Sequence, residues 1–375
     1  MQMSIRWFYW SKMKSALKNK IRETIQNEMD GSISFSKFMD MCLYDPDDGY
    51  YSSQFNQFGK HGDFYTAPML GQTFAITLTK QIEQCFLEVR ENILEIGAGN
   101  AQLAIDMVLS LNERGIHLNN YYILEKSQEL KQYQLKVLQE KLPIELFKKI
   151  TWVEEFVDQF NGVIIANELF DAIPADVFSS FENEIMEKKV RVDNHNFSWV
   201  LSENKKHFDY QLSLGDGAFD FEYSSGYHKI FSEFARAEQM VCFIFDYGMD
   251  ERQLFHSSRP HGTLRGFKKN LLTEIFENIG EQDITYHVNF THLAFLTQKF
   301  NLNILGYTHQ SHFLNNLGLE IEDNNKMKDH LKLLSDINLL TSPAEMGELI
   351  KVMAISKGCQ SSLNGFINFD KTHLL

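Results

Sequence analysis

The sequence has few of the features that mark a disulfide-stabilised, fibrous or membrane-spanning protein. Its 375 residues include only four cysteines, Cys42, Cys85, Cys242 and Cys359, with no CxxC pair, so neither a disulfide framework nor a zinc site is expected. The six prolines are dispersed without forming a linker. Apolar runs are too short for a membrane span or a signal-peptide core. We therefore expect no stable membrane insertion and a cytoplasmic location.

Positive charge is also scarce. Lys and Arg total 36 against 50 Asp and Glu, which gives a net charge of −14 and argues against nonspecific binding of nucleic acid. The first acidic residue is Glu23, and six basic residues precede it. This N-terminal bias leaves one alternative location open, the mitochondrial matrix, in which case the N-terminus is a transit peptide.

The central part of the chain alternates between short apolar runs and helical patterns. The runs are Ile93–Ile96, Tyr121–Leu124, Gly162–Ala166 and Val241–Phe245. This alternation predicts an α/β protein with a largely parallel, doubly wound sheet. Because residues 1–90 have a different texture, rich in loops between helical stretches, we expect an N-terminal cap at 1–90 and a core at 91–375.

Two further patterns interrupt or end this core. Between about 176 and 238 the alternation breaks, and apolar residues alternate on both sides of Asp193–Asn196, which predicts an inserted β-hairpin within a mixed hairpin and helical region. Near the C-terminus we expect a helix at Thr291–Phe300 and a strand at Ile350–Ile355 that closes the edge of the sheet.

The segment ILEIGAGN, Ile93–Asn100, predicts a cofactor site where a buried strand runs into a glycine turn and a helix. Gly97 and Gly99 allow the backbone to pass close to a ligand. A dinucleotide site favours a third glycine where this chain has Gln102, and Glu95 is unfavourable beside a pyrophosphate. Glu95 suits a cofactor that carries an ammonium group, such as S-adenosylmethionine, although a nicotinamide cofactor stays open.

Polar residues follow the other predicted strands at the same end of the sheet. Glu125 ends the second strand, where a carboxylate can accept hydrogen bonds from both ribose hydroxyls. Asn167, Glu168 and Asp171 follow the Gly162–Ala166 run, and Asp246 follows Phe245. Since ligands of open α/β sheets bind beyond these strand ends, the cluster is a candidate for contact with the cofactor or a cationic substrate.

A set of ordered motifs extends from about residue 30 to the end of the chain. They are LYDPDDGYY (43–51), FGKHGDFYTAP (58–68), ILEIGAGNAQLA (93–104), ANELFDAIP (166–174), FDYG (245–248), GTLRGF (262–267), DITYHVNF (283–290), GYTHQ (306–310) and GELIKVMA (347–354). Taken together, the motifs resemble those of the MidA-type family of S-adenosylmethionine-dependent methyltransferases. Its mitochondrial members are assembly factors of respiratory complex I that act as protein arginine methyltransferases.

The resemblance implies a class I, Rossmann-like methyltransferase core with a seven-stranded sheet. It implies that S-adenosylmethionine lies over Gly97 and Gly99 with its ribose on Glu125, and that Asp63 and Thr66 help to enclose the methyl donor. The substrate side of the site would comprise Asn167, Glu168 and Asp171. The chain departs from the family in the reduced basic stretch Lys268–Asn270, which bears on the identity of the substrate.

The first interpretation is therefore a protein arginine N-methyltransferase that uses S-adenosyl-L-methionine and acts on a protein, with a respiratory complex I-type subunit implied by the resemblance. Because a guanidinium stays protonated at neutral pH, a carboxylate must orient it and share its proton. Glu168 is the first candidate and Asp171 the second. Two alternatives stay open: a catalytically silent scaffold or assembly protein of the same fold, and a NAD(P)-dependent oxidoreductase. No metal site is expected, and the oligomeric state is not predicted.

Overall fold

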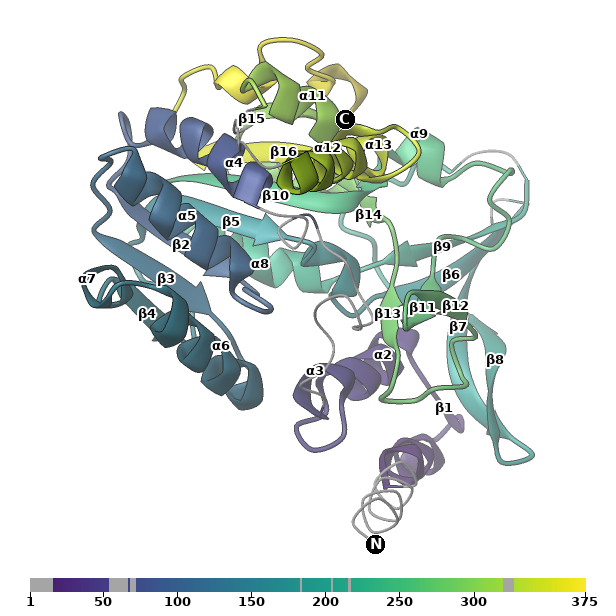
Figure 1. Cartoon of the computed structure of the whole chain (residues 1–375). Coiled ribbons are helices and arrows are strands. Elements are labelled where there is room, and N and C mark those ends of the chain that lie inside the picture. The colour runs from purple at the N-terminus through teal and green to yellow at the C-terminus, as the bar shows by residue number, and fades with distance from the viewer. Residues whose placement is uncertain are drawn as a thin grey trace, which may run out of the picture.

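A large mixed sheet with helices on both faces organises the protein (Figure 1). The computed structural model describes residues 16–53, 67, 72–182, 184–203, 205–214, 217–319 and 327–375. Within these residues the sheet has the strand order β15-β16-β10-β5-β2-β3-β4, and β14 pairs with the end of β10. The eight strands are β2 (Asn92–Ile96), β3 (Asn120–Leu124), β4 (Ile150–Val153), β5 (Asn161–Asn167), β10 (Gln239–Met249), β14 (Val288–Asn289), β15 (Asn303–His309) and β16 (Ile350–Lys357).

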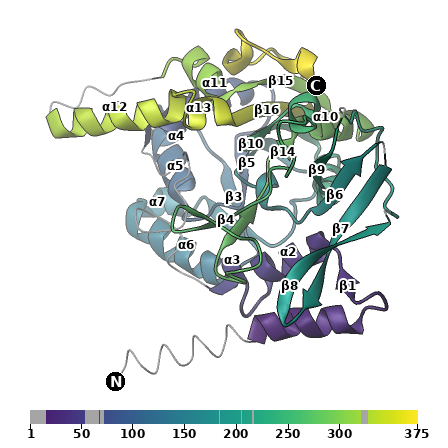
Figure 2. The same ribbon diagram turned by 90° about the vertical axis from the view of Figure 1, so that its right-hand side faces the viewer.

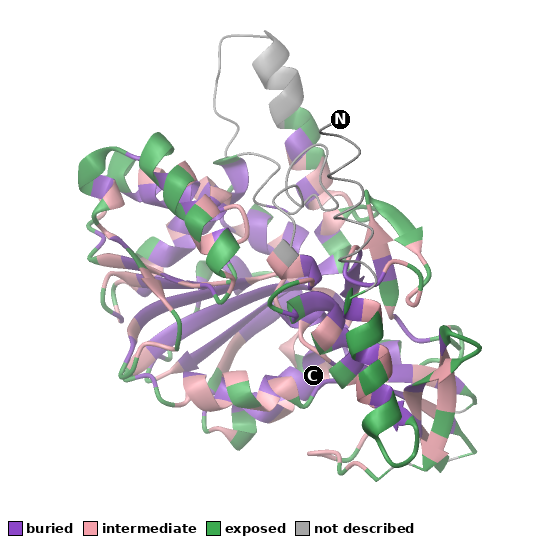
Figure 3. Ribbon diagram, turned by 90° about the horizontal axis from the view of Figure 1, so that it is seen from below, coloured by how far each residue is buried: buried purple, intermediate pink, exposed green. Residues whose placement is uncertain are grey.

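The α/β class expected from the apolar runs is confirmed. Each of the four predicted runs lies in a strand, namely β2, β3, β5 or β10, and these strands pair in parallel. In β5, Val163 and Ile165 face one core cluster while Ile164 and Ala166 face the other. The run is continuously apolar because helices cover both faces of the sheet, so both sets of side chains are buried (Figure 3).

The two helical layers follow from amphipathic periodicity. In α5, Leu103, Met107 and Leu111 are buried against the sheet at helical spacing. One layer contributes α4 (Gln72–Cys85), α5 (Gln102–Glu113), α6 (Gln128–Lys141) and α11 (Gln310–Asn316). The other contributes α2 (Phe35–Tyr44), α8 (Gly226–Phe234) and α10 (Phe290–Lys299).

Shorter elements connect these layers. They are α3 (Tyr50–Ser53), α7 (Ile144–Phe147), α9 (Glu251–Leu254), α12 (Met327–Thr341), α13 (Met346–Leu349), and the 3-10 turns η2 (Phe170–Ala172), η3 (Asn364–Phe366) and η4 (Thr372–Leu374). A further helix covers residues 16–27 and lies beside the hairpin of the second sheet (Figure 2). There Arg22 Nη2 donates to the carbonyl of His195 at 2.7 Å.

Two smaller sheets flank the central one. The second comprises β1 (Ser32–Ile33), β6 (Asp176–Phe181), β7 (Glu184–Asp193), β8 (Asn196–Glu203) and β9 (Phe219–Tyr223), and the third comprises β11 (Arg265–Lys268), β12 (Leu271–Thr273) and β13 (Asp283–Thr285). The hairpin predicted around Asp193–Asn196 is confirmed, because Asp193 pairs with Asn196 across a turn in which Asn194 and His195 have φ of 46° and 69°. The division into a cap at 1–90, a core at 91–375 and an insertion at 176–238 stays a prediction.

The position predicted for the strand at Ile350–Ile355 was wrong. β16 lies between β10 and β15 and is antiparallel to both, so β15 forms the edge of the sheet. The apolar character of β16 reflects this interior position, since all but its last residue are buried. β15 was missed because Gly306 interrupts it; a Cβ there would lie 2.3 Å from the Phe366 ring, so the close packing excludes a strand-forming side chain.

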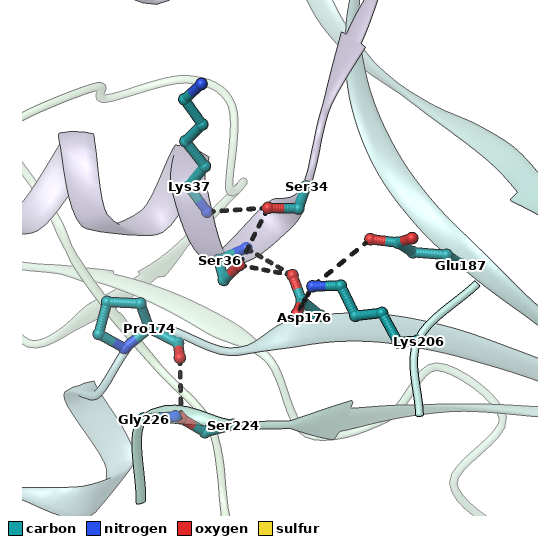
Figure 4. A network of polar contacts seen from close by, with 9 residues as sticks. All are labelled: Ser34, Ser36, Lys37, Pro174, Asp176, Glu187, Lys206, Ser224 and Gly226. Carbon is teal, nitrogen blue, oxygen red and sulfur yellow. Dashed lines mark hydrogen bonds and ion pairs between the residues drawn. The ribbon is translucent and has the colours of Figure 1, made fainter. Parts of the chain in front are cut away.

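A buried polar network ties α2 to the start of β6 (Figure 4). Asp176 is 1% exposed and accepts hydrogen bonds from Ser36, at 3.2 Å from its backbone nitrogen and 2.6 Å from its hydroxyl. Lys206 forms an ion pair with the same carboxylate. Two residues before Asp176, the carbonyl of Pro174 accepts from Ser224 Oγ at 2.8 Å. These bonds brace the segment that leads away from the ends of β5 and η2.

We predict that Asp176→Ala lowers the free energy of unfolding by about 2 to 4 kcal/mol, because it leaves the Ser36 donors and the Lys206 ammonium without their buried acceptor. Urea unfolding followed by fluorescence measures this change. The control is Glu28→Ala, which removes a surface ion pair with Lys37 and should cost less than about 1 kcal/mol. Equal losses in the two variants would contradict a structural role for the buried network.

Candidate functional site

A cavity of about 1390 Å³ opens beyond the carboxyl ends of β2, β3 and β5. It brings together most of the predicted site residues, although they lie far apart in the sequence. The members that line it are Glu95, Gly97, Gly99, Glu125, Asn167, Glu168 and Asp171. Asp63 and Thr66, which were predicted to enclose the methyl donor, lie outside the described residues.

The turn between β2 and α5 presents backbone to the cavity. Gly97 and Gly99 have φ of 72° and 50°, a region that side chains disfavour. The amide of Gly97 donates to the carbonyl of Leu124 at 3.0 Å, which ties the turn to the end of β3. A Cβ on Gly97 would come within 3.4 Å of Leu169, so the turn also sits close to the loop after β5. The result is a cradle without side chains beside the tips of three strands.

Glu125 is held at the tip of β3 by a buried glutamine. Its Oε1 accepts from the backbone of Ser127 at 3.0 Å, and its Oε2 accepts from Gln134 Nε2 at 3.0 Å. The same Gln134 nitrogen donates to the carbonyl of Gly99 at 3.0 Å, while Gln134 Oε1 accepts from Trp152 at 3.0 Å. Gln134 therefore links the glycine turn to the carboxylate. Burial raises the pKa of Glu125.

Gln134 was not among the predicted site residues, although the sequence contains a signal for it. On α6 the buried residues are Leu130, Gln134 and Leu138, so an amide occupies the centre of an apolar row at a spacing of four. A polar side chain at such a position requires buried partners. Its partners are far away in sequence, which is why the spacing alone did not reveal its role.

Glu95 lies inside the sheet at the inner end of the cavity. It is 3% exposed, and Tyr121 donates to its Oε2 at 2.8 Å. Burial, together with the nearby charge of Glu125, raises the pKa of Glu95 to about 7. A ligand ammonium close to Glu95 would stabilise the charged carboxylate and lower this pKa.

The loop after β5 places Glu168 under backbone strain. Its φ is 48°, in the left-handed region, and its amide donates to the carbonyl of Phe245 at 2.8 Å. The carboxyl Oε1 accepts from the backbone of Ala67 and from Asn167 Nδ2, both at 3.3 Å. Burial, and then the charge of Asp246, raises the pKa of Glu168 to about 8. Strain of this kind is retained where the surroundings hold a side chain for a task.

Asp246 shapes the same loop from the neighbouring strand. Its Oδ2 accepts from the backbone amides of Leu169, Phe170 and Asp171 at 3.1, 2.7 and 3.4 Å. The carboxyl group is fully buried, and burial raises its pKa to about 7. The sequence predicted Asp246 at a strand tip, but its hydrogen bonds identify it as a positioning residue for the loop.

Asp171 adds a third buried acid. Its side chain is 7% exposed and lines the cavity, and burial together with Asp246, Asp283 and Glu168 raises its pKa well above the usual value. Among the described residues, no Lys, Arg or His side chain forms an ion pair with Glu168, Asp171 or Asp246. Three close carboxyl groups without a cation make this end of the cavity a binding site for positive charge.

Two searches of the described residues bear on other functions. No group of three or more His, Cys, Asp or Glu side chains in this part of the chain is placed to hold a metal ion. In the same residues no helix has both the length and the apolar character required to cross a bilayer.

The mixed sheet, the glycine turn after its first strand and the carboxylate at the tip of the next strand define an S-adenosylmethionine-dependent methyltransferase. Residues 73–308, more than half of the chain, match the family described as "Putative S-adenosyl-L-methionine-dependent methyltransferase". The chain belongs to this family. Its cofactor is S-adenosyl-L-methionine.

Relatives with assigned activities support this class. The chain is 24% identical to the mitochondrial protein arginine methyltransferase NDUFAF7 of Bos taurus, over 87% of this chain and 80% of that protein. It is 25% identical to the protein of the same name in Danio rerio, over 91% of this chain and 87% of the relative. The names of these relatives place them in mitochondria, so they do not support the cytoplasmic location expected from the sequence.

Two solved structures share the fold over nearly the whole chain. A COG1565 superfamily member from Burkholderia thailandensis, bound to S-adenosyl-homocysteine, is 29% identical with a TM-score of 0.91, and the match covers 97% of each chain. A native structure of a COG1565 superfamily protein from the same organism is 30% identical with a TM-score of 0.88 over the same shares. These likenesses support the methyltransferase interpretation over the NAD(P)-dependent oxidoreductase and the catalytically silent scaffold.

We predict that Gly99→Asp weakens binding of S-adenosylmethionine by at least about 100-fold, because it adds a side chain and a negative charge where φ is positive and backbone faces the cavity. Calorimetric titration with S-adenosylmethionine, NADH and NADPH measures this loss and the cofactor preference.

The control for that experiment is Gly115→Asp. Gly115 also has a positive φ, of 69°, but nothing lies within 4 Å of a Cβ there, and it does not line the cavity. Backbone strain alone therefore affects both variants. Retained affinity in Gly99→Asp, or an equal loss in Gly115→Asp, would remove Gly99 from the cofactor site.

Proposed function

We propose that this methyltransferase is a protein arginine N-methyltransferase. The observation that carries the proposal is the group of buried carboxyl groups, Glu168, Asp171 and Asp246, which have no cationic partner among the described residues and lie beside the glycine turn. A guanidinium is permanently charged and binds carboxylates through paired N–H donors. The name of the mitochondrial relatives supports the same substrate class.

The described residues fit the cofactor on geometric grounds. Gly97 and Gly99 form the cradle, and Glu125, oriented by Gln134, is placed to accept from ribose hydroxyls. Glu95 suits the ammonium group. Asn167 Oδ1 is buried and has no hydrogen-bond partner, so it offers an acceptor to the methionyl part. Asp63 and Thr66 stay predictions for the enclosing loop.

Bound S-adenosylmethionine supplies the activated methyl group. The protein's task is to orient the acceptor nitrogen and receive the proton that the guanidinium loses when that nitrogen is methylated. Glu168 is the residue assigned to both roles, because its strained backbone and its contacts with Ala67 and Asn167 hold the carboxyl group in place. Asp171, beside it in the loop, pairs with the remaining guanidinium charge.

The strand order supports a finer classification of the fold. The path β4-β3-β2-β5-β10-β16-β15, with an antiparallel strand next to one edge, fits the seven-stranded core of a class I methyltransferase, and β14 is then an addition to it. The names of the relatives support the mitochondrial matrix as the location. The acceptor is then a protein of that compartment, and the family resemblance favours a subunit of respiratory complex I.

We predict that Glu168→Gln lowers kcat for an arginine-containing peptide by about 100-fold or more, because the amide keeps the shape but neither carries the charge nor accepts the proton. The affinity for S-adenosylmethionine should change less than about threefold. Transfer of labelled methyl groups and calorimetric titration measure these two quantities. Glu83→Gln, a partly exposed partner of Arg114, is the control. Full turnover by Glu168→Gln would exclude Glu168 from catalysis.

We also predict that kcat/KM rises with pH between about 7 and 8. A carboxyl group with a raised pKa is neutral below that pKa and charged above it, and only the charged form attracts the guanidinium. Glu168 has a pKa of about 8 and Asp246 about 7 in the free protein, so the rise reports this interacting group of acids. In Glu168→Gln the residual activity should have its rise at lower pH. A wild-type profile that is flat between pH 6 and pH 9 would contradict this assignment.

A further inference from the structure

Two of the sequence motifs have no role in the site as described above. LYDPDDGYY supplies Tyr44 and Tyr51, at the end of α2 and in α3, and DITYHVNF supplies Asp283, the first residue of β13. More than 230 residues separate Tyr51 from Asp283, yet the two side chains are in contact. All three residues line the cavity.

Asp283 is a fixed and almost fully buried carboxylate. It is 2% exposed, and the Tyr51 hydroxyl lies 3.0 Å from each of its two carboxyl oxygens. The amide of Ile284 donates to Oδ1 at 2.9 Å. A carboxylate held from one side by a hydroxyl and a backbone amide has a defined plane, as paired recognition of a planar cation requires.

The tyrosines form an aromatic wall beside this carboxylate. Tyr44 stacks on Tyr51 with ring centroids 5.4 Å apart and an interplanar angle of 28°. The Tyr44 hydroxyl donates to the carbonyl of Ala172 at 3.0 Å, which attaches the wall to the loop that carries Asp171. Burial, followed by the charge of Asp283, raises the pKa of both hydroxyls, so they stay neutral donors.

Asp171 provides an independent indication of a ligand. Its carboxyl group is more than nine-tenths buried and lines the same cavity, yet no described side chain or backbone group donates a hydrogen bond to it. Asp283 is close enough to raise the pKa of Asp171, and the amide of Tyr286, on the same segment as Asp283, donates to the Asp171 carbonyl at 3.2 Å. The two acids therefore border one space.

We propose that Asp283, Tyr51 and Tyr44, together with Asp171, form a subsite that binds the planar guanidinium of the acceptor and selects it over the ammonium of lysine. The assignment rests on the proposed function and extends it from catalysis to substrate selection. A guanidinium is planar, weakly hydrated and able to stack on an aromatic face while it donates paired hydrogen bonds. A lysine ammonium is compact and strongly hydrated, and it lacks both the plane and the fork of donors.

Binding of side-chain analogues tests the subsite without requiring turnover. The protein, saturated with S-adenosylhomocysteine, is titrated calorimetrically with n-propylguanidinium and with n-butylammonium, which reproduce the side chains of arginine and lysine. We expect the guanidinium to bind at least about tenfold more tightly. Equal affinity for the two cations, or no binding of either, would overturn the proposal.

Three variants locate the preference. Asp283→Asn removes the charge and should abolish it, whereas Tyr51→Phe keeps the ring but releases the carboxylate and should reduce it by about three- to tenfold. Tyr44→Leu removes the stacking face at a residue that is 40% exposed, and so it tests the subsite even if Asp283→Asn does not fold. Affinity for S-adenosylhomocysteine should be unchanged in all three. An unchanged guanidinium preference in folded Asp283→Asn or in Tyr44→Leu would overturn the assignment.

The matched control is Tyr210→Phe. Tyr210 also donates from a buried hydroxyl to a carboxylate, Glu251 Oε2 at 2.6 Å, but neither residue lines the cavity. Its loss of stability is comparable, and its guanidinium preference should be that of the wild type. Methyl transfer to arginine peptides is measured in parallel: a protein that prefers the guanidinium but transfers no methyl group would overturn the proposed activity and leave the subsite standing.

Discussion

The site depends on one carboxylate, Asp246, which accepts hydrogen bonds from three consecutive backbone amides. These bonds turn the chain sharply after β5 and build η2, so that Glu168 and Asp171 face the same cavity. Without a buried acceptor those amides would be unsatisfied, and the left-handed backbone of Glu168 would relax. The acceptor is itself an acid, so the interaction that positions the loop also adds negative charge next to it.

This arrangement is unfavourable in isolation and is maintained by the rest of the fold. Burial and mutual repulsion raise the pKa values of Glu168, Asp171 and Asp246, which means that the free protein spends free energy of folding on holding acids together. The two apolar layers on either side of the sheet and the Asp176 network after the loop supply the compensating stability. A bound cation relieves the repulsion, so the same frustration becomes affinity for a positively charged acceptor.

Much of the core followed from local patterns in the sequence. Continuous apolar runs predicted β2, β3, β5 and β10 because strands covered on both faces cannot carry polar residues. Gly97, Gly99 and Glu125 were predicted from their place after such runs. The order of β15 and β16 was not, because strand order is decided by pairing between distant segments, and Gly306 gives β15 a weak local pattern.

The sequence by itself determined the class of fold, the cofactor and the end of the sheet where the site lies, because these depend on periodicity, glycine conformation and residues next to one another along the chain. The comparisons agree with each of these. Only the tertiary structure decided which side chains meet: Gln134 between Gly99 and Glu125, Asp246 under the loop, and Tyr51 on Asp283. Such contacts join elements that are distant in sequence, and no local pattern encodes the packing that brings them within hydrogen-bonding distance.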